Sequence, residues 1–308
     1  MDERRRTEER RTTSATEPCC EAAAVNSKAA GSAVQAEPCC DQSAGAATRE
    51  EIAADASAED IRKLVRAKYG EIAQASSPSC CGTSVVENPE ALGYTAAQAE
   101  AIPAGANLGL GCGSPLKYAN VRSGETVLDL GSGAGIDAFL AAREIGANGH
   151  VIGVDMTAAM IERARSNARA VGAANVEFRL GEIEHLPVAD ASVDLVISNC
   201  VINLSPDKPQ VFREALRVLR PGGRLLVSDL VLLRPLPEDA KRSVEAYVGC
   251  VAGASLRDDY VRLVREAGFT GVEIVEESRY AGCDTGMPAE LQDFTNAVVS
   301  LKLRAWKR

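Results

Sequence analysis

Between residues 126 and 228, short apolar runs alternate with amphipathic segments of helical length. The first apolar run, 126–130, is followed by a helical pattern over 136–145, and the run 150–154 by another over 158–171. Strands that alternate with helices of this length form βαβ units, and such units build a parallel sheet with helices on both faces. We therefore predict an α/β protein with a doubly wound, mostly parallel sheet.

Further elements are expected on either side of this alternation. A helical spacing over 58–74 precedes it, and a loop-rich stretch follows that helix. After Asp229 the alternation breaks. The remaining predicted elements are strands at 176–180, 194–199, 224–228 and 272–275, helices at 209–219 and 258–267, a helix from 236 towards 250, and a turn at Pro221-Gly-Gly223.

We expect four regions along the chain. Residues 1–55 are rich in Ala, Glu, Arg, Thr and Ser without periodicity, contain Glu-Pro-Cys-Cys twice, and are predicted to form a disordered tail. A helical and loop segment is expected over 56–122, and a cofactor-binding domain over 123–230. A smaller C-terminal α+β region, 231–308, is expected to cap the cofactor edge and to bind substrate.

Composition narrows the class of partner. The net charge of −9 argues against nucleic acid, because phosphate binding needs a basic surface. No segment approaches the ~18 apolar residues of a membrane helix, and the N-terminus lacks the apolar core of a secretory signal. We therefore expect a cytoplasmic protein without a membrane partner, whose ten cysteines are mostly reduced and available as ligands or redox groups.

The first predicted strand leads directly into the loop Gly131-Ser-Gly133-Ala-Gly135. Glycine permits the backbone dihedrals of a tight strand-to-helix turn and the close approach of a ligand. Asp155 ends the next strand, twenty residues past Gly135, where a carboxylate can bind two ribose hydroxyls. Asp129 stands just before the loop and can bind an amino group. This pattern favours a cofactor with an amino-acid moiety over a dinucleotide.

Together with Leu219-Arg-Pro-Gly-Gly223, the glycine loop resembles the class I S-adenosylmethionine-dependent methyltransferases, whose fold is Rossmann-like. The resemblance covers about residues 123 to 229 and implies S-adenosylmethionine as cofactor. It implies contacts with the methionine end, the ribose and the adenine. The residues that it assigns to the cofactor are Asp129, Gly131, Gly133, Gly135, Asp155, Met156, Glu182 and Ile183, with Glu182 or the backbone at Ile183 contacting the adenine.

The cysteines fall into two groups. Cys112, Cys200 and Cys250 are single and lie in three different segments, each near the expected cofactor edge. A single cysteine is more often a small buried hydrophobe than a ligand, and we interpret Cys283 in that way. Adjacent pairs are different, because two neighbouring thiols pack poorly together and soft thiolates select soft metals and metalloids. The pairs are Cys19-Cys20, Cys39-Cys40 and Cys80-Cys81.

Several motifs between residues 65 and 254 carry a second and more specific resemblance. They are Val65-Arg-Ala-Lys-Tyr-Gly70, Gly109-Leu-Gly-Cys112-Gly-Ser-Pro115, Gly153-Val-Asp-Met-Thr157, Ser198-Asn-Cys-Val-Ile-Asn-Leu204 followed by Pro206-Asp-Lys208, and Gly249-Cys-Val-Ala-Gly-Ala254. With these motifs the segment resembles the arsenite methyltransferases.

This second resemblance implies that Cys112, Cys200 and Cys250 bind trivalent arsenic. It also implies a fourth, redox-active thiol at the Cys80-Cys81 pair, of which we favour Cys81. Cofactor contacts by Tyr69 and Asn199 are implied as well. The N-terminal cysteine pairs fall outside the family pattern and are either auxiliary arsenic sites or part of an inert tail.

The expected function is methyl transfer from S-adenosylmethionine to trivalent arsenic, as a detoxification reaction. The substrate would be arsenite, methylarsenite or their thiol conjugates, and the reductant thioredoxin or glutathione. The alternative is a methyltransferase of a quinone-like or other organic small molecule, in which the thiols are incidental. A non-catalytic metalloid sensor is a third hypothesis, but such a protein has no use for the glycine loop and Asp155.

Overall fold

In the computed structural model of the chain, the described residues are 50–75, 90, 93–279, 294 and 296–308. The chain divides into two compact units, Met1–Ala47 and Thr48–Arg308, and everything described belongs to the second. The tail with its two cysteine pairs, the Cys80-Cys81 pair and Cys283 lie outside the described residues. Within the described ranges, no helix is both long and apolar enough to cross a bilayer.

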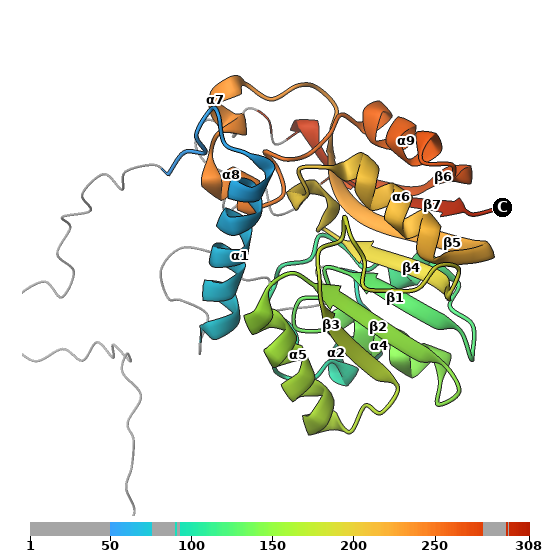
Figure 1. Cartoon of the computed structure of the whole chain (residues 1–308). Coiled ribbons are helices and arrows are strands. Elements are labelled where there is room, and N and C mark those ends of the chain that lie inside the picture. Colours follow the sequence, from blue (N-terminus) through green and yellow to red (C-terminus); the bar gives the residue numbers. More distant parts are fainter. Residues whose placement is uncertain (1–49, 76–89, 91–92, 280–293, 295) are drawn as a thin grey trace, which may run out of the picture. The chain divides into compact units, whose positions relative to one another are not determined.

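One mixed sheet forms the centre of the second unit (Figure 1). Its strands are β1 Thr126–Leu130, β2 His150–Asp155, β3 Val176–Leu180, β4 Val193–Asn199, β5 Leu219–Leu232, β6 Thr270–Arg279 and β7 Val298–Trp306. Their order is β3-β2-β1-β4-β5-β7-β6. Neighbours among β1 to β5 pair in parallel, whereas β7 is antiparallel to both β5 and β6. The predicted doubly wound, mostly parallel α/β sheet is confirmed.

The helices lie on both faces of this sheet. They are α1 Ala58–Gln74, α2 Ala96–Ala101, α3 Leu116–Ala119, α4 Ile136–Ile145, α5 Ala158–Val171, the short 3-10 helix η2 Ile202–Leu204, α6 Lys208–Val218, α7 Glu238–Lys241, α8 Val244–Val248 and α9 Arg257–Glu266. Side chains of β1 alternate between two apolar cores: Leu128 packs with α6 and α9, and Val127 with α4. Burial on both faces explains why the inner parallel strands β1 and β4 are largely apolar runs in the sequence, whereas the edge strand β3 carries charged residues.

The strand β5 differs from its prediction, because it begins at Leu219 and includes the expected Pro-Gly-Gly turn. Leu219 pairs with Val193 and Arg224 with Leu195, so the intervening residues bulge out of the ladder. Gly222 has a φ of 80° there, and its N–H donates to the carbonyl of Lys307 at 2.9 Å. The turn residues therefore remain bonded to the C-terminal end of the chain, and the strand continues through them.

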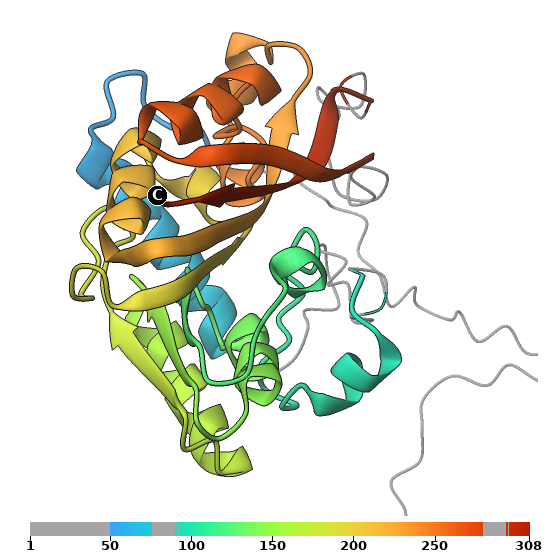
Figure 2. The same cartoon turned by 90° about the vertical axis from the view of Figure 1, so that its right-hand side faces the viewer.

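Two further differences lie in the C-terminal part. A single helix is predicted from 236 towards 250, but the structure has two short helices, α7 and α8. The hydroxyl of Ser243 accepts a hydrogen bond from Ala246 N at 3.2 Å and so caps the start of α8. The prediction does not contain β7. Figure 2 shows this strand between β5 and β6, so the last segment of the chain is an interior strand of the sheet.

Candidate active site

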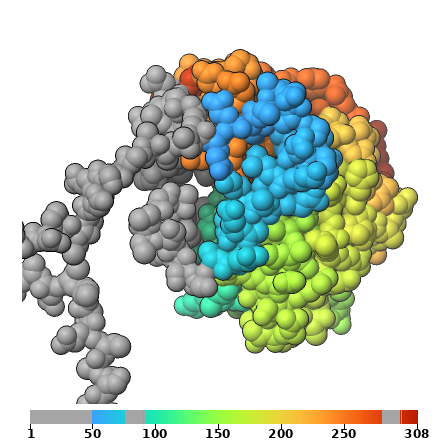
Figure 3. Space-filling view, turned by 60° about the vertical axis from the view of Figure 1, so that its left-hand side comes forward, coloured from blue at the N-terminus to red at the C-terminus, as the bar shows by residue number. Residues whose placement is uncertain are grey.

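A cavity of about 1040 Å³ opens at the carboxyl ends of the parallel strands. This is where open α/β sheets bind ligands. The helix α1 closes one side with Tyr69, and Figure 3 shows α1 packed against the segments of α5, α7 and α8. The loop 106–111 lines another side. The residues that follow β1, β2, β3 and β4 and line the cavity include Gly131, Met156, Ile183 and Cys200.

The three glycines after β1 serve different purposes. All have positive φ, namely 63° at Gly131, 51° at Gly133 and 102° at Gly135, so other residues would be strained there. A Cβ on Gly131 would lie 2.3 Å from the side chain of Val201, and one on Gly135 would lie 2.6 Å from Phe139. A Cβ on Gly133 would meet nothing within 4 Å, and this residue lines the cavity. Gly133 therefore leaves open space beside the backbone for a ligand.

Asp155 ends β2 with its carboxylate held in one orientation. Its Oδ2 accepts a hydrogen bond from Gly133 N at 2.9 Å, and its Oδ1 accepts one from Thr157 N at 2.8 Å. Burial raises the pKa of this carboxyl, and the hydrogen bonds from Thr157 and Gly133 oppose that rise. Each carboxylate oxygen has a further lone pair, so Asp155 can accept two hydroxyl donors from a ligand.

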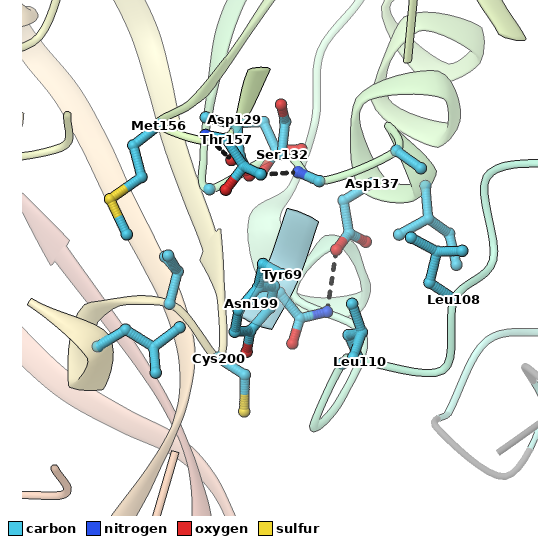
Figure 4. Close-up of a pocket in the computed structure, with 18 of the residues that line it drawn as sticks. Tyr69, Leu108, Leu110, Asp129, Ser132, Asp137, Met156, Thr157, Asn199 and Cys200 are labelled. Atoms are coloured by element: carbon cyan, nitrogen blue, oxygen red, sulfur yellow. Dashed lines mark hydrogen bonds between the residues drawn. The ribbon is translucent and has the colours of Figure 1, made fainter. Parts of the chain in front are cut away.

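Asp129 and Asp137 form a buried acidic pair beside the same cavity. Asp137 accepts a hydrogen bond of 2.9 Å from the hydroxyl of Tyr94. It accepts another of 2.9 Å from Nδ2 of Asn199 (Figure 4). Burial raises the pKa of both carboxyls, and repulsion from Asp137 and then Asp155 raises that of Asp129 further. Buried carboxylates are unfavourable unless a positive charge compensates them. This end of the cavity therefore favours a cationic ligand.

Three cysteines from distant segments meet beside the cavity. Cys112 and Cys200, separated by 88 positions, form a disulfide with their Cα atoms 5.8 Å apart. The free thiol of Cys250 donates to the carbonyl oxygen of Cys200 at 2.8 Å. The expectation of reduced cysteines is wrong for the Cys112–Cys200 pair, because the fold brings the two sulfurs within bonding distance.

Cys200 and Cys250 share an unusual backbone conformation. Their φ angles are 54° and 64°, in the left-handed region that costs a non-glycine residue on the order of 1–3 kcal/mol. Hydrogen bonds hold both residues there: Cys200 N donates to Ser228 O at 2.8 Å, and Asn203 Nδ2 to Cys250 O at 3.3 Å. Burial raises the pKa of the Cys250 thiol, and the charge of Asp229 raises it further. This thiol therefore keeps its proton until a ligand replaces it.

Comparison with known proteins places this site in a family. The family described as a methyltransferase domain matches residues 121–268. The arsenite methyltransferase of Halobacterium salinarum is 47% identical over 273 residues, which cover 84% of this chain and 69% of the relative. The arsenite methyltransferase of Aquipseudomonas alcaligenes is 38% identical over 76% of this chain and 69% of its own length. This chain belongs to the arsenite methyltransferases.

A solved structure supports the same assignment. It is that of CrArsM, an arsenic(III) S-adenosylmethionine methyltransferase from Chlamydomonas reinhardtii. It is 39% identical to this chain and superposes with a TM-score of 0.57, covering 74% of this chain and 75% of the other.

S-adenosylmethionine is the cofactor of this arsenite methyltransferase, and the cavity fits it on three counts. The acidic pair of Asp129 and Asp137 suits a ligand that carries an ammonium and a sulfonium charge. The oriented carboxylate of Asp155 suits ribose hydroxyls. In the glycine loop, Gly133 leaves open space, and Oγ of Ser132 is buried without a partner among the described residues.

Most of the predicted site residues line this cavity, and the others lie elsewhere. Glu182 is not among the lining residues, because it pairs with Arg62 and Arg66 of α1 at 3.4 Å each. Gly135 packs behind the loop, and Cys81 lies outside the described residues. Cys112 and Cys250 are buried around Cys200. The predicted residues that line the cavity are Tyr69, Asp129, Gly131, Gly133, Asp155, Met156, Ile183, Asn199 and Cys200.

Asp137 and Tyr94 are among the cavity residues that are missing from the prediction. Asp137 had a signal in the sequence, because it is a lone charge in the apolar helix start Ile136-Asp-Ala-Phe-Leu140. Tyr94 had no such signal. Its hydroxyl reaches Asp137 only because the chain folds back over α4, which brings together residues 43 positions apart.

Proposed function

We propose that the protein transfers methyl groups from S-adenosylmethionine to trivalent arsenic held by the thiolates of Cys112, Cys200 and Cys250. The observation that carries the proposal is the meeting of these three cysteines at the cofactor cavity. Cys200 lines the cavity, bonds to Cys112 and accepts from the thiol of Cys250. Thiolates are the ligands that soft metalloids prefer. Detoxification of arsenic is the physiological role that we infer.

The cofactor supplies an electrophilic methyl group on a sulfonium sulfur. Asp155 would hold the ribose through its two fixed oxygens. Asp129 and Asp137 compensate the positive charge of the methionine end, and Asn199 and Tyr94 hold Asp137 in place by hydrogen bonds. These residues would hold the cofactor in the cavity that Cys200 also lines, directly after the end of β4.

Arsenite enters the reduced site by ligand exchange. Three thiols and As(OH)₃ give the trithiolate and three water molecules, so each thiol proton leaves with one hydroxide. Arsenic bound by the three thiolates would keep a lone pair, and Cys112, Cys200 and Cys250 would present it to the methyl group that the cofactor supplies when bound. This nucleophile carries no proton, so no general base is needed. Positioning of the two reactants supplies much of the rate enhancement, up to about 7–11 kcal/mol.

Methyl transfer oxidises arsenic from the trivalent to the pentavalent state. Two thiols can return the two electrons by forming one disulfide, and a dithiol of thioredoxin or two molecules of glutathione then reopen it. The Cys112–Cys200 disulfide is the kind of oxidised site that such a step leaves. We assign the fourth thiol, Cys81 of the Cys80-Cys81 pair, to this electron transfer, and we place the protein in the reducing cytoplasm.

The other two hypotheses account for less of the site. A methyltransferase of an organic small molecule gives no role to the convergence of Cys112, Cys200 and Cys250. A metalloid sensor gives no role to the acidic pair or to Asp155.

The test is incubation of the reduced protein with arsenite, a thiol and S-adenosylmethionine, followed by chromatography of the arsenic products with mass detection. We expect methylated arsenic from the wild-type protein. Cys200→Ser should abolish it while the affinity for S-adenosylmethionine stays within a few fold. Cys283→Ser, at the cysteine that we interpret as a small hydrophobe, serves as the cysteine control. Wild-type turnover of arsenite by Cys200→Ser would refute the thiol assignment.

A further inference from the structure

The strand β7 carries two buried polar side chains that the proposed reaction leaves without a role. Ser300 and Lys302 are 2% and 5% exposed. They share one face of β7, because side chains two residues apart in a strand point to the same side. The intervening Leu301 belongs to the apolar core on the other face. Polar groups buried in this way need hydrogen-bond partners, and one partner of Ser300 lies in the Cys112 loop.

The hydrogen bonds of these residues form a chain with a fixed direction. Nζ of Lys302 lies 3.0 Å from Oγ of Ser300 and 2.9 Å from Oε1 of Glu276. An ammonium group only donates, so the hydroxyl of Ser300 accepts from Lys302 and must give its own proton elsewhere. That proton goes to the carbonyl oxygen of Cys112 at 2.8 Å. Lys302 thus orients Ser300, and Ser300 holds the peptide of Cys112.

The loop also rests directly on the stem of Lys302. A Cβ on Gly113 would lie 2.6 Å from Oγ of Ser228 and 2.8 Å from Cε of Lys302. Ser228 on β5 and Glu276 on β6 are the register partners of Lys302 in the two neighbouring strands. The support under Cys112 is therefore built across three strands at the antiparallel side of the sheet.

Side chains hold the other backbone groups of this loop too. Cys112 N donates to Oδ1 of Asn199 at 3.2 Å, and the carbonyl of Gly113 accepts from Nδ2 of Asn199 at 2.7 Å. Cys112 itself lies in neither a helix nor a strand. Its position therefore depends on these side-chain bonds, with Asn199 on the cofactor side and Ser300 on the β7 side.

We propose that Ser300 and Lys302 are positioning residues that hold Cys112 where its sulfur can share one arsenic atom with Cys200 and Cys250. The inference rests on the proposed role of Cys112 in arsenic binding. Neither residue is among those that line the cofactor cavity. Loss of either one therefore releases Cys112 without removing a cofactor contact.

The test compares Ser300→Ala and Lys302→Met with the conservative variants Ser300→Thr and Lys302→Arg. The matched control is Lys117→Met, because Lys117 pairs with the same Glu276 at 3.3 Å but its side chain is 57% exposed. For each reduced protein we would measure KM for arsenite, KM and Kd for S-adenosylmethionine, and the ultraviolet absorption of arsenic–thiolate bonds during titration with arsenite.

We expect Ser300→Ala and Lys302→Met to raise KM for arsenite and the arsenite concentration at half-maximal absorption by roughly tenfold to a hundredfold, because small misplacements of reacting groups are costly. The Kd for S-adenosylmethionine should stay within twofold. Ser300→Thr and Lys302→Arg should recover most of the loss, and Lys117→Met should match the wild type. If Lys302→Met does not fold, the Ser300 pair decides the question alone.

Two results would overturn the proposal. If Ser300→Ala gives the same arsenite titration curve as the wild-type protein, Cys112 needs no support from β7. Equal losses in arsenite and cofactor binding, without recovery in Ser300→Thr, would show a general structural role instead. Cys112→Ser separates this question from the proposed function: normal arsenite methylation by Cys112→Ser would defeat the thiol assignment itself. If Cys112→Ser is inactive and Ser300→Ala binds arsenite as the wild-type protein does, only the positioning role is refuted.

Discussion

The carboxyls beside the cofactor cavity show how single residues set the electrostatics of the site. Asp129 and Asp137 are buried and Asp155 is partly buried, and burial raises the pKa of each. Without a ligand, ionisation of these groups is unfavourable. With a cationic ligand the same ionisation becomes favourable, because the ligand supplies the missing counter-charge. Protein stability and cofactor binding should therefore depend on pH in opposite directions.

The first prediction follows from the sign of these shifts. The pKa of an Asp carboxyl in the unfolded chain is about 3.9. A carboxyl whose pKa is higher in the folded protein stabilises the fold fully below about pH 3.9, and this stabilisation is lost as the pH rises through the folded pKa. For Asp137 the folded pKa is about 6. We expect the melting temperature without cofactor to fall between about pH 4 and pH 6, and the stabilisation by S-adenosylmethionine to grow over the same range.

Thermal melts at several pH values, with and without saturating cofactor, would check this prediction. Asp137→Asn should flatten the pH dependence and weaken cofactor binding by about tenfold or more, since hydrogen bonds to a charged group contribute about 1.5–3 kcal/mol. Cofactor stabilisation that does not change between pH 4 and pH 7 in the wild type would contradict it.

At the level of elements, α1 is the helix that closes the cavity from outside the sheet (Figure 3). Ser57 and Asp60 cap its start reciprocally, which explains why its N-terminus agrees with the prediction. Ion pairs connect it to the loop after β3: Arg62 lies 3.5 Å from Glu184 and Arg66 lies 3.4 Å from Glu182. These pairs tie the helix to the segment that contains Ile183, at the expected adenine position.

The second prediction concerns these ion pairs. The Arg66–Glu182 pair is partly exposed and should contribute about 0–1 kcal/mol to stability. Arg62 faces the buried Glu184, so Arg62→Ala leaves a buried carboxylate without this partner, and the double variant Arg62→Ala with Arg66→Ala should melt several degrees lower. The same double variant should weaken S-adenosylmethionine binding several fold, because α1 is held less firmly over the cavity. Equilibrium dialysis at low and high salt would measure this, with added salt weakening the wild type more than the variant. The control is Arg262→Ala on α9, whose pairs with Asp259 and Glu266 lie on an exposed helix surface.

On the scale of the whole molecule, the three cysteines join three segments that lie far apart in the sequence. A bond between positions 88 residues apart restricts the unfolded chain. In the chain-entropy model, a disulfide that closes a loop of this length stabilises the folded protein by at most about 4–5 kcal/mol. A trivalent arsenic bound to Cys112, Cys200 and Cys250 would cross-link the same segments and a third one.

The third prediction is that reduction lowers the melting temperature by several degrees and that arsenite restores it. Each kcal/mol corresponds to about 2–4 °C for a domain of this size class. Calorimetry of oxidised, reduced and arsenite-loaded protein would test this, with Cys200→Ser as the control that arsenite should not stabilise. The oxidised protein should bind S-adenosylmethionine but not arsenite, because two of the three ligands are already joined. Arsenite binding to the oxidised protein with wild-type affinity would contradict the shared site.

The sequence alone determined the elements and the cofactor loop, because these depend on neighbours in the chain. The expected ranges of α1, β1, α4, α5 and β3 agree with the structure, since each has its own apolar period and its own start signal. Asp155 and the glycines follow from the same local pattern.

Only the tertiary structure decided which side chains meet. The bond between Cys112 and Cys200, the hydrogen bonds of Asp137, and the support of Cys112 by Ser300 join residues from 43 to 188 positions apart. No local period encodes such contacts. They arise because the parallel strands align their carboxyl ends and because β7 returns to lie between β5 and β6, which places distant segments around one cavity.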